Sequence, residues 1–400
     1  TQGVSSAASD VYKRQNALYP GATLGIIGLD RNGSTLITAA KRAGFNVGVY
    51  VDHAQPSLTK QADFTIGGAY NNQEKLTMFA QTCDAIIYAN DLIDSSVLRY
   101  LSRDAYLPQG VNALEIVQDR LMERAFLDQI NVNVAPYVTV ISLDDVYQSI
   151  DSIGYPAILK PIQRGIGEQS MRIVKQSDIT RAADFINAGT YLLESWIDHT
   201  AEYTMLAATN GENVQVFPAI ELMLNTDEKL LGVKTPANLS ADISREMERI
   251  VTSVAENLQY RGVFRVDFYV TATGNLYVHG IEPGLSTYGN VFDYATNVSQ
   301  TEQLLRAIAG MPLFEVQTLQ PTVMMLARVA QRAALQRQWL LKDNWHYRFF
   351  TEVREDPQAV AGFVWAVGKS SLEELQHQIE DTEVWNEKAS TDSNPAPDQQ

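Results

Sequence analysis

The stretch VFRVDFYVTATGNLYVHGIEPGLSTYGN (Val263–Asn290) decides the fold of this chain. In VFRVDFYV, apolar and polar side chains alternate with the period of two that is typical of a β-strand. Arg265 and Asp267 therefore point away from the apolar face. That apolar face consists of Phe264, Val266, Phe268 and Val270. The stretch as a whole predicts a β-hairpin with a carboxylate on its polar face.

The Asp267 carboxylate has two interpretations. It can hold Mg²⁺, which prefers carboxylate oxygens and the phosphates of a substrate as ligands. It can also form an ion pair with Arg265, which lies two residues away on the same face of the strand. The residues taken by themselves leave both interpretations open.

Upstream of the hairpin, short apolar runs alternate with amphipathic stretches from Thr23 onward. TLGIIG, NVGVYVD and DAIIYAN are predicted to be buried strands, with helices in GSTLITAAKRAGF and EKLTMFAQTC. Such a βαβ repeat predicts a parallel sheet that is covered by helices. NALEIVQDRLMERAFLDQI then predicts one long amphipathic helix, which closes the first domain near Ala135.

The middle of the chain predicts a second domain that mixes helices and strands. A helix capped by Ser142 ends at Gly154, and a strand starts with AILK. Further strands follow in MRIV, TYLLESWI and EYTMLAATNGENVQVFPAIELM, where Asn210-Gly211 is a strong hairpin signal. A helix over 240–258 leads into the hairpin described above.

We expect an N-terminal α/β domain over 16–135, a central domain over 136–320 and a small C-terminal domain over 321–385. The C-terminal domain is predicted from a strand, a helix, the strands HYRFFTEV and AVAGFVWAVG, and a last helix in SSLEELQHQ. Residues 1–15 resemble a translated sequencing adaptor and are expected to be a non-native or disordered leader. The tail over 386–400 is rich in Ser, Asp, Asn and Pro and is expected to be disordered.

Composition argues against several classes of function. A formal charge of −16 disfavours nucleic acid, whose backbone needs clustered Lys and Arg. No run approaches the ~18 apolar residues needed to span a bilayer, so no membrane contact is expected. The one cysteine, Cys83, cannot form an intramolecular disulfide, which suits a reducing cytoplasm. The five histidines lack the spacing of a structural zinc site.

Two loops are candidates for binding phosphate. In Gly28–Gly33, backbone N–H groups between a strand and a helix could cradle an anion, but a tight structural turn is favoured. The G-x-G-x-x-G spacing of a Rossmann dehydrogenase and the lysine of a P-loop are both missing there. Lys160 ends an apolar strand before the Gly-containing PIQRGIGEQS, and could place its charge over a polyphosphate. The alternative is a surface lysine at the end of a strand.

A candidate nucleoside site follows in the segment Glu194-Ser-Trp-Ile197. An adenine needs backbone groups for its edge and apolar walls for its faces, and a ribose needs a carboxylate for its hydroxyls. Trp196 and Ile197 could supply the walls, and Glu202 the carboxylate. The alternative is that Trp196 belongs to the core.

In this order, the segments resemble the ATP-grasp superfamily, and most closely the 5-(carboxyamino)imidazole ribonucleotide synthase family of purine biosynthesis. The resemblance runs from about Gly21 to Trp385. Its most specific pieces are ALEIVQDRLMERAFL (family Q-D-R-L-x-E-K-x-F-L), GYPAILKP and SQTEQLLRAIAGMPL (family S-Q-F-E-Q-H-L-R-A-I-x-G-x-P-L). It implies an α/β fold: a biotin-carboxylase-like N-terminal parallel sheet domain, a central ATP-grasp α+β domain and a small β-rich C-terminal domain.

The resemblance also implies a chemistry. In that family MgATP activates bicarbonate as carboxyphosphate, which carboxylates the amine of aminoimidazole ribonucleotide. The implied cofactors are ATP and Mg²⁺, and the implied substrates are an amine with bicarbonate or another carboxylate, in a cytoplasmic homodimer. By position, ATP would be bound by Arg120, Lys160, Glu194, Trp196, Ile197 and Glu202, the metal by Asp267 and Glu282, and the substrate by Arg354.

Several positions depart from the family pattern. The family's G-G-G-Q-L-G turn is GLDRNG here, and its glycine-rich lid is reduced to roughly Arg164–Gly167. The family's N-E-I-A-P-R, which supplies the second metal carboxylate, is replaced by HGIEPG, so that Gly280 has no ligand and the arginine is lost. Glu282 lies on the same face as Gly280, but about 6.6 Å further along the strand. In the C-terminal domain, basic positions of the family are Thr351, Ala359 and Val360.

These departures leave two hypotheses. The first is an ATP-grasp carboxylate-amine ligase like the synthase family, with a changed substrate because an unpaired buried phosphate is expensive. The second is a catalytically degenerate nucleotide-binding homologue that acts as a regulatory or partner module. The loss of one charge-stabilising group commonly costs about 100-fold in the rate of phosphoryl transfer, which motivates the second.

Overall fold

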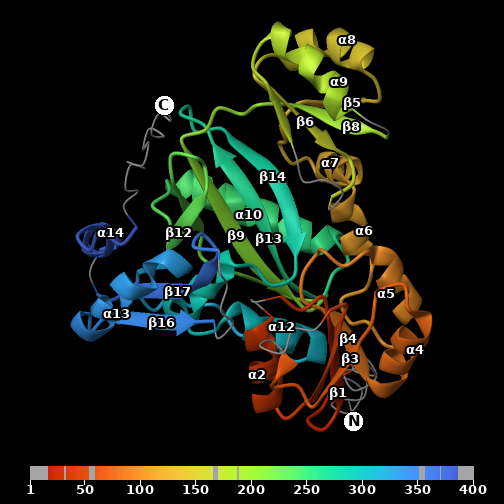
Figure 1. Cartoon of the computed structure of the whole chain (residues 1–400), viewed down its shortest axis with the longest axis vertical. Helices are drawn as coiled ribbons and strands as arrows, with labels where there is room; N and C mark the ends of the chain where they lie inside the picture. Colours follow the sequence, from red (N-terminus) through yellow and green to blue (C-terminus); the bar gives the residue numbers. More distant parts are fainter. Residues whose placement is uncertain are drawn as a thin grey trace, which may run out of the picture.

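The computed structural model describes residues 17–30, 33–53, 59–164, 170–186, 189–350, 356–369 and 371–385. In these residues the chain forms three β-sheets with helices packed on them (Figure 1). No helix within the described ranges is long and apolar enough to span a membrane.

The N-terminal sheet is parallel throughout, with the strand order β3-β2-β1-β4. It confirms the predicted βαβ repeat. β3 was not predicted, because its four residues FTIG have only two apolar side chains in alternation. The elements are β1 (Thr23–Ile27), α2 (Ser34–Arg42), β2 (Asn46–Val51), β3 (Phe64–Gly67), α4 (Gln73–Thr82), β4 (Ala85–Tyr88) and α5 (Ser95–Leu101).

The predicted long helix after this sheet is wrong, because it is broken at Asp119 into α6 (Asn112–Gln118) and α7 (Arg120–Gln129). Asp119 has extended backbone angles, and its side chain accepts hydrogen bonds from the N–H groups of Leu121 and Met122. It is therefore the N-cap of α7. The break frees the backbone N–H of Arg120 to donate to the carbonyl of Ile162 at 2.9 Å.

A small lobe contains a four-stranded antiparallel sheet in the order β5-β8-β6-β7. In Figure 1 it is the yellow part that projects away from the other two sheets. The predicted cap of α8 is confirmed as a full capping box of Ser142 and Asp145, and Gly154 ends the helix at φ 85°. The elements are β5 (Tyr137–Val140), α8 (Leu143–Ile153), β6 (Ala157–Pro161), β7 (Met171–Ile173), η1 (Gln176–Arg181), α9 (Ala182–Phe185) and β8 (Tyr191–Ser195).

The largest sheet has nine strands, in the order β14-β13-β9-β11-β12-β15-β17-β16 with β10 paired to β9. The hairpin predicted from the opening stretch is its β13–β14 edge, and the Asn210-Gly211 hairpin joins β9 to β10. Its central elements are β9 (Ala201–Thr209), β10 (Val214–Val216), β11 (Ile220–Leu224), β12 (Leu230–Thr235), α10 (Ala241–Asn257), β13 (Gly262–Val270), β14 (Leu276–Pro283), η2 (Tyr288–Val291), α11 (Phe292–Ala295) and α12 (Gln300–Ala309).

The C-terminal strands extend this same sheet, since β15 pairs with β12. The predicted boundary between 320 and 321 therefore crosses a continuous sheet, and it stays a prediction like the other domain limits. The remaining elements are β15 (Thr322–Arg328), η3 (Val329–Gln331), α13 (Arg332–Leu341), β16 (Trp345–Phe349), β17 (Val360–Val367) and α14 (Leu372–Glu380).

One apolar cluster joins the N-terminal sheet to the large sheet. It includes Leu36 of α2, Leu304 of α12 and Leu206 of β9, all fully buried. Each such side chain contributes roughly 1.5–3 kcal/mol through burial. The cluster holds the ends of β1 and β4 beside the β13–β14 hairpin, where the site described next is formed.

Candidate active site

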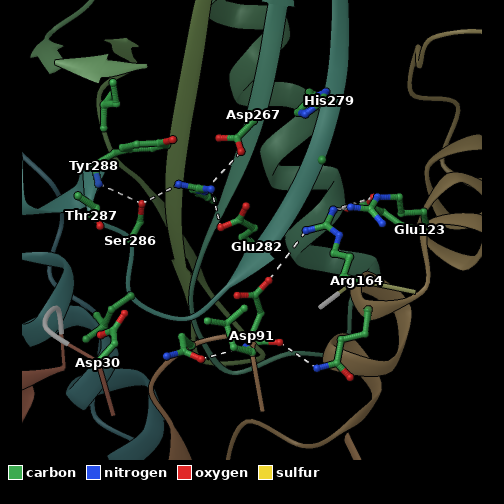
Figure 2. A pocket seen from close by; sticks show the side chains of 18 of the residues that line it. Asp30, Asp91, Glu123, Arg164, Asp267, His279, Glu282, Ser286, Thr287 and Tyr288 are labelled. Carbon is green, nitrogen blue, oxygen red and sulfur yellow. Dashed lines mark hydrogen bonds and ion pairs between the residues drawn. The ribbon is translucent and has the colours of Figure 1, made fainter. Parts of the chain in front are cut away.

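A cavity of about 690 Å³ is lined by the β13–β14 hairpin, by β6 and α7, and by residues that follow β1 and β4 (Figure 2). Lys160 and Asp267, predicted to face the same hollow, both line it. Among the described residues, the lining contains five carboxylates and five Lys or Arg side chains, so the cavity is densely charged but balanced. They are Asp30, Asp91, Glu123, Asp267 and Glu282, and Arg120, Arg124, Lys160, Arg164 and Arg265.

Glu194, near the end of β8, binds two basic side chains. Its Oε2 accepts a hydrogen bond from Lys160 Nζ at 2.9 Å, and its Oε1 accepts from Arg124 Nε and Nη2 at 3.0 and 2.7 Å. Burial would raise the pKa of this carboxyl group, but the charges of Lys160 and Arg124 outweigh burial and lower the pKa to about 2. Glu194 therefore stays ionised and fixes Lys160 at the cavity wall.

On the hairpin, the carboxylates of Asp267 and Glu282 lie on one face (Figure 2). The Arg265 guanidinium is within ion-pair distance of both. Arg265 Nη2 is 2.5 Å from Glu282 Oε2, and its Nε is 3.4 Å from Asp267 Oδ2. Ser286 Oγ accepts a hydrogen bond from Arg265 Nη1 at 3.1 Å, and the guanidinium lies 4.3 Å from the centre of the Tyr288 ring. The ion pair predicted as one interpretation of Asp267 is present.

Asp267 also retains the capacity to bind a cation. Burial raises the pKa of Asp267 to about 6, against the opposing charge of Arg265. Its Oδ1 is buried and has no hydrogen-bond partner among the described residues, whereas buried polar atoms are normally paired. This unpaired oxygen fits Mg²⁺, with Glu282 on the same face as a second candidate ligand.

Such a cation would need ligands from outside the chain. No group of three or more His, Cys, Asp or Glu side chains in the described ranges could hold a metal ion by itself. Mg²⁺ commonly keeps only one or two carboxylate ligands and takes the rest from phosphates and water. The two carboxylates of Asp267 and Glu282 therefore fit a cation that binds together with a phosphate-bearing ligand.

Glu123 and Arg164 form the wall of the cavity beside Gly280. Glu123 Oε1 accepts hydrogen bonds from the backbone N–H of Ile281 at 2.7 Å and from Arg164 Nη2 at 2.8 Å. Neither Glu123 nor Arg124 was predicted as a site residue. The available signal was their spacing, since residues three and four positions after Arg120 lie on the same helix face.

Arg120 lines the cavity at the start of α7, as the predicted role in phosphate binding requires. Its Nη1 donates a hydrogen bond to the carbonyl of Pro161 at 2.6 Å. Burial lowers the pKa of Arg120, and the nearby charge of Arg164 lowers it further. An anionic ligand would relieve this crowding of positive charge.

Trp196, Ile197 and Glu202 are not among the described residues that line this cavity; they lie where β8 continues into β9. The His199 ring connects them: its Nδ1 lies 2.8 Å from Ile197 O and its Nε2 lies 3.2 Å from Glu202 Oε1. Trp196 is only half-buried, with the Arg172 guanidinium 4.1 Å from its ring centre, so it is not simply core.

An aromatic row leads from this segment to the cavity. The ring of His199 stacks on Tyr269 with centroids 4.1 Å apart, and Tyr269 lies 4.7 Å from the ring of His279, which lines the cavity. Burial, followed by the charge of Lys160, lowers the pKa of His279 well below its usual value, so this imidazole is neutral.

Some of the remaining predicted positions lie outside the residues that the structure describes. Arg354 lies outside the described residues, as do Thr351 and 165–167 of the shortened lid. In the turn after β1, Gly28 has φ 68° and the Gly33 N–H donates to Asp30 Oδ1 at 2.9 Å, which agrees with the predicted tight turn. Asp30 nevertheless lines the cavity.

Comparison with known proteins gives two domain matches. The ATP-grasp domain matches residues 125–300, and the ribonucleotide synthetase preATP-grasp domain matches residues 21–118. The N5-carboxyaminoimidazole ribonucleotide synthase of Bacillus subtilis strain 168 is 31% identical over 311 residues, which cover 77% of this chain and 81% of that protein.

Solved structures agree with these matches. An ADP complex of an N5-carboxyaminoimidazole ribonucleotide synthetase has a TM-score of 0.87 at 25% identity, covering 93% of this chain and 98% of that one. The synthase of Aspergillus clavatus, in complex with ADP and 5-aminoimidazole ribonucleotide, has a TM-score of 0.82 at 19% identity, covering 91% and 98%, and so shares the fold. The predicted fold class is confirmed.

Proposed function

Because this chain belongs to the family of N5-carboxyaminoimidazole ribonucleotide synthases, we propose that it uses ATP and bicarbonate to carboxylate the amine of 5-aminoimidazole ribonucleotide. Membership of the family, which the sequence predicted, makes it an ATP-grasp ligase of purine biosynthesis. The substrates, the cations and the roles of individual residues are our assignments.

The main support for this proposal is that Lys160 and Asp267 line one cavity although they come from different sheets. Phosphoryl transfer depends almost entirely on positioning and on stabilising negative charge. The cavity offers both, because Arg120, Lys160 and Arg164 are held by hydrogen bonds to the chain itself.

We assign the phosphates of ATP to Arg120 and Lys160. Glu194 acts through Lys160 as a positioning residue, since its two oxygens are taken up by Lys160 and Arg124. Trp196 and Ile197 are assigned to the adenine and Glu202 to the ribose, next to the aromatic row that leads to the cavity.

Asp267 and Glu282 are the residues that would hold Mg²⁺, which when bound neutralises charge on the transferred phosphoryl group. Arg265, which is within ion-pair distance of both carboxylates, balances their charge and orients them. Arg354 stays a candidate for the substrate, and the homodimer stays a prediction.

The alternative of a degenerate nucleotide-binding module is not favoured by the described residues. The carboxylate missing at Gly280 is matched by Glu282 on the same face of the hairpin, and the arginine lost at Gly284 is matched by Arg265 on the neighbouring strand. The hairpin therefore retains both kinds of charge that the alternative supposes to be lost.

The test is ADP formation by the purified chain. We expect release of ADP from MgATP that requires both bicarbonate and 5-aminoimidazole ribonucleotide, with each omitted in turn as a control. Calorimetry with MgATP runs in parallel. Tight nucleotide binding without ADP release, across a panel of amines, would contradict the ligase and favour the degenerate module.

A further inference from the structure

Gly280 lies directly opposite Asp267 in the β13–β14 pair, and the side chains of Arg164 and Glu123 lie close to the position that its own side chain would take. Its backbone is outside the left-handed region, so backbone conformation does not require glycine there. A Cβ at position 280 would lie 3.0 Å from Arg164 Nη2 and 3.4 Å from Glu123 Oε1. A side chain at position 280 would therefore crowd the Arg164 guanidinium, which would have to shift by a few tenths of an ångström.

Hydrogen bonds hold the Arg164 guanidinium in this position. Glu123 accepts two hydrogen bonds from Arg164 Nη2, at 2.8 Å to Oε1 and 3.0 Å to Oε2. Glu123 is itself fixed by the N–H of Ile281, and its side chain is 1% exposed. The Arg164 backbone N–H donates to the carbonyl of Gln118 at 2.9 Å, so both ends of the residue are held.

Some guanidinium N–H groups of Arg164 nevertheless form no hydrogen bond with the described residues. Its Nε is buried without a hydrogen-bond partner among the described residues. Its Nη1 forms an ion pair with Asp91 Oδ2 at 3.9 Å, a separation too long for a hydrogen bond. Arg164 lines the same cavity as Lys160 and Asp267, so a fixed cation with unused donors faces the place assigned to the phosphates.

We infer that Arg164 is a catalytic residue of the proposed ligase, whose guanidinium binds the nucleotide phosphates beside Gly280 in place of a metal ion. The site then holds one divalent cation, at Asp267, and not two. This inference rests on the proposed function. A guanidinium presents parallel N–H donors that match phosphate oxygens, and a cation fixed in advance needs no reorganisation during the reaction.

The test counts divalent cations directly. Mn²⁺ bound to the protein is measured by electron paramagnetic resonance in the presence of the non-hydrolysable ATP analogue AMPPNP, and bound AMPPNP is measured by equilibrium dialysis. We expect one Mn²⁺ per bound nucleotide in the unmodified chain. Gly280→Glu combined with Arg164→Ala replaces the guanidinium with a carboxylate opposite Asp267, and we expect it to bind two.

Single substitutions of Arg164 test whether its guanidinium binds the nucleotide phosphates. Arg164→Ala should weaken AMPPNP binding by about 10-fold or more, and Arg164→Lys should restore part of the affinity. Thermal melting of each variant checks that it is folded. Two Mn²⁺ per nucleotide in the unmodified chain, or unaltered AMPPNP affinity in folded Arg164→Ala, would overturn the role of Arg164 and leave the proposed ligase standing. Absence of AMPPNP binding to the unmodified chain would overturn both.

Discussion

Lys160 and Glu194 form an ion pair across the neighbouring strands β6 and β8, with 2.9 Å between Nζ and Oε2. Both side chains are largely buried, at 13% and 5% exposure. A free lysine side chain has many rotamers and loses rotamer entropy when it binds a ligand. Because the ion pair already holds Lys160 in one orientation, less of this entropy remains to be lost on binding. The pair therefore prepares Lys160 for an anionic ligand in the cavity.

Replacing Lys160 should therefore weaken nucleotide binding. We expect Lys160→Ala to raise the Kd for MgADP by about 10- to 100-fold, the range for a lost hydrogen bond to a charged group. Calorimetry measures this. Lys229→Ala is the control, because Lys229 is 68% exposed on the turn between β11 and β12. Equal Kd values for the two variants would contradict the assignment of Lys160.

Glu194→Gln should destabilise the fold in a way that depends on pH. The folded-state pKa of about 2 lies below the value of about 4.3 in an unfolded chain, so the carboxylate stabilises the fold above about pH 4.3. This contribution is lost as the pH falls toward 2, and it corresponds to about 3 kcal/mol near neutral pH. Urea unfolding at about pH 7 and about pH 3 measures it. A difference between wild type and variant that does not shrink at low pH would refute this prediction.

Asp267→Asn should remove the carboxylate with the unpaired oxygen while the strand stays intact. Arg265 keeps Glu282 as a partner, so we expect little change in melting temperature. Mn²⁺ affinity in the presence of ADP should fall, and ADP formation should fall by about 100-fold or more, as for other lost charge-stabilising groups. Asp227→Asn, on an exposed turn, is the control. Unchanged Mn²⁺ binding in Asp267→Asn would exclude this residue as the ligand.

The break between α6 and α7 offers a test that separates stability from function. Asp119→Ala removes the cap of α7 and should cost about 0.5–2 kcal/mol of stability. It should also raise the Kd for MgADP, because the same break positions Arg120. Asn72→Ala removes the cap of α4, which does not line the cavity, and should cost a similar stability without a change in Kd. Equal effects of the two variants on the Kd would disprove the link.

Local patterns predicted most of the secondary structure, since β1, α2, the capping box of α8 and the β13–β14 hairpin all depend on neighbouring residues. The long helix over 112–130 failed for a physical reason. Asp119 is compatible with a helix by its spacing, but its side chain caps α7, and the next residue, Arg120, donates its backbone N–H to Ile162, which directly follows β6. Only the tertiary contact with Ile162 shows that preference.

The site was predicted only in part for a related reason. Lys160 and Asp267 were recognisable because each follows or interrupts a strand pattern. Glu123 and Arg164 are 41 residues apart, and their pairing beside Gly280 arises from packing of α7 against the hairpin. Arg265 was noted only as a partner of Asp267, because its contact with Glu282 depends on the register of β13 against β14.

The most direct measurement is a crystal structure of the chain with ADP. We predict that the ADP phosphates lie in the 690 Å³ cavity between Lys160 and Asp267, with the adenine toward Trp196. A second cavity of about 680 Å³ is lined by Ser34, Thr301 and Arg348 among others. ADP bound there, with the cavity of Lys160 and Asp267 empty, would contradict the assignment of the active site.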